Sequence, residues 1–196
     1  MFWDNVAGVY DIFANIINRK THRGLCAKVE NEISITDEVL ECACGTGLLS
    51  GVIAEKCNSL IATDFSVKML KKASKKYHAY TNIEFRKGNI LQIEYPDEKF
   101  DVVVAANVIH LLDEPLRALE EMDLSGKSYF LDVSLEEAET SIRASLKDAA
   151  RSVIAVGHYL KVIRDKELYR EAGYENVEYS LIEGKIPCAI AVITKK

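Results

Sequence analysis

Apolar residues recur every three or four positions near the start of the chain, which is the spacing of one helical face. A second set with the same spacing runs through Leu25, Val29 and Ile33, before the polar pair Thr36-Asp37. We therefore predict two helices, which together form an N-terminal helical cap over residues 1–35. The first set consists of Phe2, Val6, Val9, Phe13 and Ile16.

Beyond this cap, short apolar segments alternate with amphipathic ones. The run Val102-Val103-Val104 is apolar on both faces, as expected for a strand that helices cover on each side. Strand–helix alternation predicts a parallel sheet with right-handed crossovers. The predicted strands are residues 38–44, 60–64, 83–86, 100–105 and 127–133, and the predicted helices are 47–57, 66–78 and 114–123.

The C-terminal pattern predicts a change of strand direction. A helix over residues 166–172 ends at Gly173, and strands follow at 177–182 and 188–194. The link between these two strands, residues 183–187, is too short for a parallel crossover. The two strands must therefore be antiparallel, so the sheet is mostly parallel with one reversed strand.

A separate helical segment lies between the fifth predicted strand and the last predicted helix. Its apolar residues recur at helical spacing from Leu135 to Val156, and Ser134 with Glu137 forms a capping box at its start. Helical insertions after the carboxyl end of a strand often cover a ligand crevice. The insertion, residues 134–162, either covers a substrate site or packs on the sheet as an ordinary helix.

Length and composition favour a single domain over residues 1–196. The chain has 25 basic and 30 acidic residues, so a nucleic-acid partner is not expected. Its longest apolar run is the six residues Cys188 to Ile193, which excludes a transmembrane segment, and no secretory signal is visible. We therefore expect a cytoplasmic protein. The oligomeric state is left open.

Five cysteines cannot all pair within one chain, which fits a reducing compartment. Cys42 and Cys44 form a C-x-C pair, but no second Cys/His pair follows at zinc spacing, so no metal site is expected. A group of lysines is interpreted as the solvent-facing side of a helix that begins near Ser66. These are Lys68, Lys71, Lys72, Lys75 and Lys76.

Four successive predicted strands end in polar or glycine-rich residues. The first runs into the turn Cys44-Gly45-Thr46-Gly47, where two glycines allow a tight bend and close approach of a ligand. The second ends at Asp64, whose carboxylate can accept both hydroxyls of a ribose or cap the following helix. Gly88-Asn89-Ile90 follows the third, and Asn107 closes the fourth. These residues converge on one rim of the sheet.

The order of these motifs resembles the class I S-adenosylmethionine-dependent methyltransferases. It is most similar to the small-molecule branch that includes the ubiquinone/menaquinone and phospholipid methyltransferases. The resemblance covers about residues 36–133, with the final strand pair extending it to the C-terminus and Trp3-Asp4 through Val9-Tyr10-Asp11 resembling the start of that branch. The motifs are E-x-A-x-G-x-G from Glu41, T-D-F-S from Thr63, G-N-I from Gly88 and the run from Phe100 to Pro115.

The resemblance implies an α/β, Rossmann-like, doubly wound sheet of seven strands, mostly parallel with the last strand antiparallel and with helices on both faces. It also implies S-adenosyl-L-methionine as the cofactor. Glu41 would hold the methionine amino end, Asp64 the ribose hydroxyls, and Asn107 would lie under the methionine portion. The other implied cofactor-binding residues are Tyr10, which helps close the site, Cys42, Ala43, Gly45 and Gly47 in the turn, and Phe65, Met69, Asn89 and Ile90 around the adenine.

Two residues depart from the pattern of this family. Ala43 stands where the family usually has glycine, and its methyl group adds bulk beside the cofactor. Asn89 stands where aspartate is usual; its amide still offers an acceptor and adds donors.

Methyl transfer from a sulfonium is an in-line displacement, so the protein must chiefly align the acceptor, the methyl group and the sulfur. His110, just beyond the fourth strand, is the candidate general base or acceptor contact, with a structural role as the alternative. The predicted acceptor is a small or lipid-like molecule, methylated at oxygen, nitrogen or carbon. Two other functions stay open: a catalytically inactive cofactor-binding scaffold, and a NAD-dependent oxidoreductase.

Overall fold

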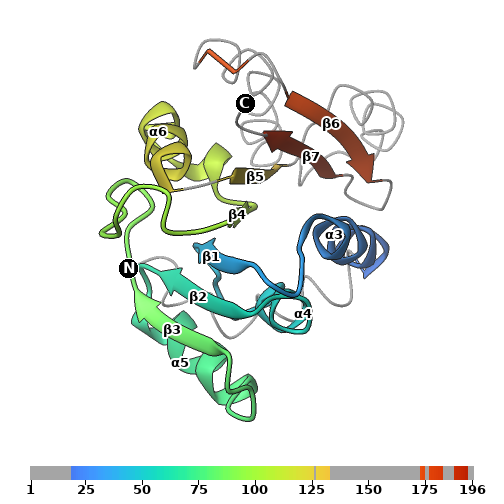
Figure 1. Ribbon diagram of the computed structural model, residues 1–196, viewed down its shortest axis with the longest axis vertical. Helices are drawn as coiled ribbons and strands as arrows, with labels where there is room; N and C mark the ends of the chain where they lie inside the picture. Colours follow the sequence, from blue (N-terminus) through green and yellow to red (C-terminus); the bar gives the residue numbers. More distant parts are fainter. Residues whose placement is uncertain (1–18, 126, 133–172, 175–176, 183–187, 194–196) are drawn as a thin grey trace, which may run out of the picture.

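The computed structural model describes residues 19–125, 127–132, 173–174, 177–182 and 188–193. Within these ranges the strands form a sheet in the order β3-β2-β1-β4-β5-β7-β6 (Figure 1). The strands are β1 (Glu38–Cys42), β2 (Ser59–Asp64), β3 (Ile83–Lys87), β4 (Val102–Ala106), β5 (Lys127–Asp132), β6 (Val177–Ile182) and β7 (Cys188–Ile193). The helices are α3 (Arg19–Glu32), α4 (Ser50–Ala54), α5 (Val67–Lys76) and α6 (Pro115–Ser125), with a 3₁₀ turn, η2 (Ile109–Leu111).

Strands β1 to β5 run parallel to one another. Val39 of β1 lies opposite Leu60 of β2 and Val102 of β4, and Asp64 at the end of β2 lies opposite Lys87 of β3. This register brings the carboxyl ends of β1, β2, β3 and β4 to one edge of the sheet. Strand β7 runs antiparallel to both β5 and β6. The prediction of a Rossmann-like α/β fold is confirmed.

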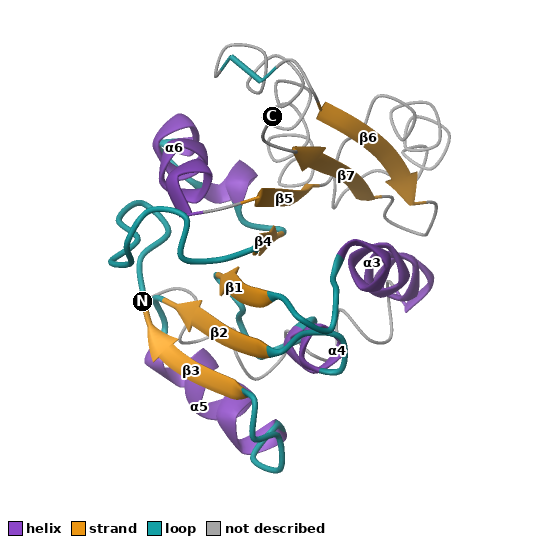
Figure 2. Cartoon of the chain, viewed as in Figure 1, coloured by secondary structure: helices purple, strands orange, loops and turns teal. Residues whose placement is uncertain are grey.

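Helices cover both faces of the sheet (Figure 2). On one face, Leu25 and Val29 of α3, Ile53 of α4 and Leu70 of α5 pack in one core with side chains such as Val104 of β4. On the other face, three side chains of α6 pack in a second core with Leu40 of β1 and Val103 of β4. These α6 residues are Ala118, Leu119 and Met122. Adjacent residues of one strand thus belong to opposite cores, as the doubly apolar pattern of the strands predicts.

Helix α4 is shorter than the predicted helix over residues 47–57. It begins only at Ser50, because Gly47 has a φ of +78° and therefore cannot belong to a right-handed helix. It ends at Ala54, before the turn that leads to β2. The helix therefore begins three residues later than predicted.

Helix α5 carries the predicted lysine face. All five lysines are exposed, while Met69, Leu70 and Ala73 are buried. Ser66 caps the helix, because its Oγ accepts the backbone N–H of Met69 at 3.2 Å. Val67, which the sequence grouped with the apolar face, is instead 47% exposed because it opens the first turn.

Several predicted segments lie outside the described residues. They are the first helix of the cap, the insertion over residues 134–162, and the helix over 166–172. In the part of the chain that the structure does describe, no helix has the length and apolar character that crossing a bilayer requires.

Candidate functional site

A cavity of about 270 Å³ lies at the carboxyl edge of the parallel strands. Gly45 lines it after β1, Asp64 at the end of β2, Asn89 after β3 and Asn107 after β4. Each residue comes from a different strand end, so the convergence of these four predicted residues is a consequence of the parallel topology. The remaining lining residues are Ala43, Phe65, Met69, Gly88, Ile90, Ala106, Val108, Leu111 and Leu112.

The turn after β1 is built on left-handed backbone conformations. Ala43, Gly45 and Gly47 have φ values of 53°, 58° and 78°. A Cβ on Gly45 would meet no atom within 4 Å, so the backbone there is open to a ligand. A Cβ on Gly47 would lie 2.8 Å from Cε2 of Tyr77, so this glycine is also required for packing. Gly45 therefore leaves room for a ligand, whereas Gly47 avoids a clash with Tyr77.

Asp64 joins the glycine turn to the start of α5. Its Oδ2 accepts the backbone N–H of Gly45 at 2.8 Å, and its Oδ1 accepts the backbone N–H of Ser66 at 2.7 Å. An ionised carboxylate has about four lone-pair sites, so each of its oxygens can accept more than one hydrogen bond. Ser66, rather than Asp64, is the residue that caps the helix. The carboxylate is thus held rigidly at the cavity wall.

Glu41 is a buried carboxyl, only 2% exposed, at the end of β1. The hydroxyl of Ser50 donates a hydrogen bond of 2.5 Å to its Oε2. Burial away from water raises the pKa of Glu41 to about 8; the charge of Asp64 raises it further, and the Ser50 hydrogen bond opposes both. Burial therefore favours the protonated form of Glu41 at neutral pH.

Three of the predicted cofactor-binding residues, Glu41, Cys42 and Gly47, are not among the described residues that line the cavity. Cys42 is buried, and desolvation raises the pKa of its thiol to about 12, so it is a neutral thiol. Cys44, also buried, carries a thiol whose pKa burial raises strongly. In the described ranges no three His, Cys, Asp or Glu side chains are grouped so that they could hold a metal.

Apolar and aromatic side chains gather at the β2–β3 end of the cavity. Phe65, Met69 and Ile90 line it together with the polar Asn89. Phe65 is 49% exposed, and the ammonium of Lys87 lies 5.3 Å from its ring centre. A large exposed aromatic side chain beside a cavity is available to cover a flat ring.

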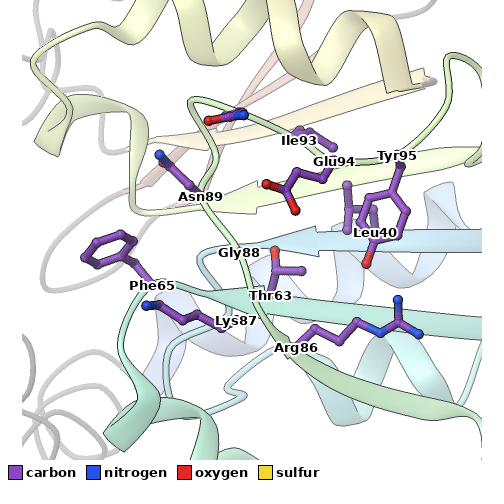
Figure 3. A pocket seen from close by; sticks show the side chains of 11 residues that line it. Leu40, Thr63, Phe65, Arg86, Lys87, Gly88, Asn89, Ile93, Glu94 and Tyr95 are labelled. Atoms are coloured by element: carbon purple, nitrogen blue, oxygen red, sulfur yellow. The ribbon is translucent and has the colours of Figure 1, made fainter.

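A second hollow of about 360 Å³ adjoins this end of the cavity (Figure 3). Phe65, Gly88 and Asn89 line both spaces. Arg86 and Tyr95 line the second space only, and hydrogen bonds to Glu84 and Tyr95 raise the pKa of the Arg86 guanidinium.

Of the remaining predicted site residues, some line the cavity and others are not described by the structure. Asn107 lines the cavity with a φ of 53°, a conformation that asparagine tolerates better than most residues. His110 lies in η2, three residues further on, but its side chain is not described. Tyr10 lies outside the described residues.

Some site residues carried no usable signal in the sequence. Leu111 and Leu112 line the cavity from η2 and its end, although the sequence did not single them out as site residues. Ser50 bonds Glu41 across nine positions, and Tyr77 packs beside Gly47 from the end of α5. These contacts depend on how α4 and α5 are placed, which local patterns do not specify.

Replacing Ala43 with glycine is expected to stabilise the protein by about 1 kcal/mol. A Cβ in the left-handed region costs about 1–2 kcal/mol. The greater flexibility of glycine in the unfolded chain offsets part of this gain. Urea unfolding measures the change. Glu98→Gly is the matched control: Glu98 is exposed, has a φ of 55° and lies away from the cavity lining. Both variants should gain stability, and a loss in Ala43→Gly would contradict the strain at this position.

The fold is Rossmann-like, and the cavity lies at the switch in strand order between β1 and β4. Residues 40–125 match the family described as "Methyltransferase domain". The demethylmenaquinone methyltransferase of Lysinibacillus sphaericus is 26% identical over 145 residues, covering 71% of this chain and 62% of that protein. That of Lactiplantibacillus plantarum is 30% identical over 128 residues, covering 61% and 54%. The chain thus spans less than two thirds of these relatives.

Solved structures share the fold. A proposed S-adenosyl-L-methionine-dependent methyltransferase from Methanococcus maripaludis matches with a TM-score of 0.71 and 21% identity, covering all of this chain and 95% of its own. The N-methyltransferase NodS from Bradyrhizobium japonicum, solved with S-adenosyl-L-homocysteine, matches with a TM-score of 0.66 and 19% identity, covering 91% and 87%. The matches therefore confirm the resemblance to class I S-adenosylmethionine-dependent methyltransferases that the sequence motifs predict.

Proposed function

We propose that this protein transfers the methyl group of S-adenosyl-L-methionine to a small or lipid-like acceptor. The observation that carries the proposal is the convergence of Gly45, Asp64, Asn89 and Asn107 on one cavity. The chemistry of these groups fits the cofactor, because a carboxylate suits ribose hydroxyls and apolar walls suit a purine. The reversed pairing of β7 with β5 and β6 supports the seven-stranded sheet with an antiparallel last strand that the sequence predicts.

Each predicted residue has a proposed part in holding the cofactor. Asp64 binds the ribose hydroxyls, and Gly45 lets the cofactor pass close to the backbone. Phe65, Met69 and Ile90 flank the adenine. Glu41 takes the methionine amino end, directly or through water, and Asn107 lies under the methionine portion. Tyr10, Cys42, Ala43, Gly47 and Asn89 complete the proposed set.

The bound cofactor supplies an electrophilic methyl group, and the chain's residues align the acceptor with it. Such alignment can contribute roughly 7–11 kcal/mol to lowering the barrier. His110 is proposed to receive the acceptor's proton where the acceptor carries one. An apolar acceptor agrees with Leu111 and Leu112 on the cavity wall and with the quinone named for the relatives.

The test is a methyl-transfer assay with labelled S-adenosyl-L-methionine and a panel of acceptors, including a demethylated naphthoquinone, a phenol and an amine. We expect turnover with at least one of them, and His110→Ala should lower kcat by about tenfold or more without weakening cofactor binding. Cofactor binding without turnover on any acceptor would favour the inactive scaffold. Full activity of the His110→Ala variant would indicate that His110 has a structural role.

A further inference from the structure

The side-chain amide of Asn89 is oriented by its own loop. The backbone N–H of Leu91 donates to Oδ1 at 3.0 Å, and the backbone N–H of Gln92 donates to the carbonyl oxygen of Asn89 at 3.0 Å. Only the oxygen of an amide can accept a hydrogen bond, so Oδ1 must face Leu91. The two Nδ2–H donors are therefore the end of the side chain that this turn does not engage.

The position of Asn89 brings these donors to the end of the cavity that suits a flat ring. Asn89 is exposed and lines the cavity with Phe65, Met69 and Ile90. Figure 3 shows Asn89 and Phe65 on the same side of the loop, away from Tyr95. A flat ring whose faces pack against these apolar side chains would present its polar edge to Asn89.

We infer that Asn89 recognises the edge of the cofactor's purine as a hydrogen-bond donor and so does not select the 6-amino group. The inference rests on the proposed function, since it concerns the same cavity. The ring nitrogens of adenine accept hydrogen bonds, whereas its 6-amino group only donates. A donor at Asn89 can pair with N7, which accepts in adenine and in a 6-oxo purine alike, or with the 6-oxo oxygen.

An aspartate at this position has the opposite preference. One carboxylate oxygen would still accept the N–H of Leu91, and the second would face the purine as an acceptor. An acceptor pairs with a 6-amino group but is left facing an oxygen when that group is replaced. Asn89→Asp should therefore convert a permissive site into one that selects the amino group.

The experiment measures the affinity of S-adenosylhomocysteine and of its deaminated form, S-inosylhomocysteine, by calorimetry. The native protein should bind the two within about threefold of each other, and Asn89→Asp should prefer the adenosyl ligand by about tenfold or more, the range of a hydrogen bond to a charged group. Asn58→Asp is the matched control, because Asn58 is exposed at the amino end of β2 and the variant adds the same charge. It should behave as the native protein does.

Each outcome is decisive. A native protein that prefers the adenosyl ligand by about tenfold or more would mean that Asn89 selects the amino purine, through Oδ1 on the 6-amino group or Nδ2 on N1, which overturns the inference. Equal binding of both ligands by Asn89→Asp would mean that residue 89 does not contact the purine edge. Binding of the adenosyl ligand in either case leaves the proposed function standing. Failure of both ligands to bind the native protein overturns the proposed function and this inference together.

Discussion

Asp64→Ala is expected to weaken S-adenosyl-L-methionine binding at least about tenfold, because the ribose hydroxyls lose an ionised acceptor. The same change frees the N–H groups of Gly45 and Ser66, which Asp64 holds at 2.8 and 2.7 Å. The glycine turn then loses its link to α5, so the site becomes less ordered as well as less polar. Calorimetric titration of the variant measures the loss.

Asp101→Ala is the control for the structural part of this effect. Asp101 accepts the backbone N–H of Glu38 at 2.9 Å, a bond of the same kind at the amino end of β1. Both variants should lose stability, but Asp101→Ala should bind the cofactor as the native protein does. Native affinity in a folded Asp64→Ala variant would remove Asp64 from the ribose site.

Glu41→Gln is expected to abolish a steep dependence of stability on pH. The pKa of Glu41 is about 8 in the folded chain, against about 4.3 for an unfolded glutamate, so the folded state keeps a proton that the unfolded state releases. The stability that this raised pKa contributes is fully present below about pH 4.3. It is lost as the pH rises from there through 8, at about 1.4 kcal/mol per pH unit. Glutamine stays neutral and can still accept the Ser50 hydroxyl.

Urea unfolding of both proteins from pH 5 to pH 9 tests this expectation. The two free energies of unfolding should differ by only about 1 kcal/mol at pH 5, and Glu41→Gln should be more stable by on the order of 3–5 kcal/mol near pH 8. The variant should also bind S-adenosyl-L-methionine more weakly, because the methionine ammonium favours the ionised form of Glu41 and so loses its proposed carboxylate partner. Parallel pH profiles would contradict the buried, protonated state of Glu41.

The residues at the rim of the site could be predicted from the sequence because the sheet is parallel. Alternating strands and helices predict a parallel sheet, and a parallel sheet brings the residues after each strand to one edge. Asp64, Asn89 and Asn107 could therefore be grouped before any contact was known, and all three line the cavity. Gly45 was found for a related reason, because a glycine-rich turn directly after a strand indicates close backbone approach.

Contacts between elements were not predictable in the same way. The bond between Ser50 and Glu41 requires a turn in which Gly45 and Gly47 both have positive φ, and that turn also shortens α4. The left-handed conformation of Ala43 contradicts the preference of alanine, so no local rule indicates it. The packing of Tyr77 beside Gly47 depends on how α5 lies against α4. Such features arise from packing rather than from local propensity.

The central claim is that the cavity at the ends of β1 to β4 binds S-adenosyl-L-methionine. Thermal unfolding in the presence of S-adenosyl-L-methionine, S-adenosylhomocysteine or NAD tests it most directly. At about 100 times its dissociation constant a ligand adds roughly 2.7 kcal/mol, which raises Tm by several degrees for a domain of this size. The account predicts such a rise with both adenosyl ligands and none with NAD. A rise with NAD alone, or with none of the three, would contradict it.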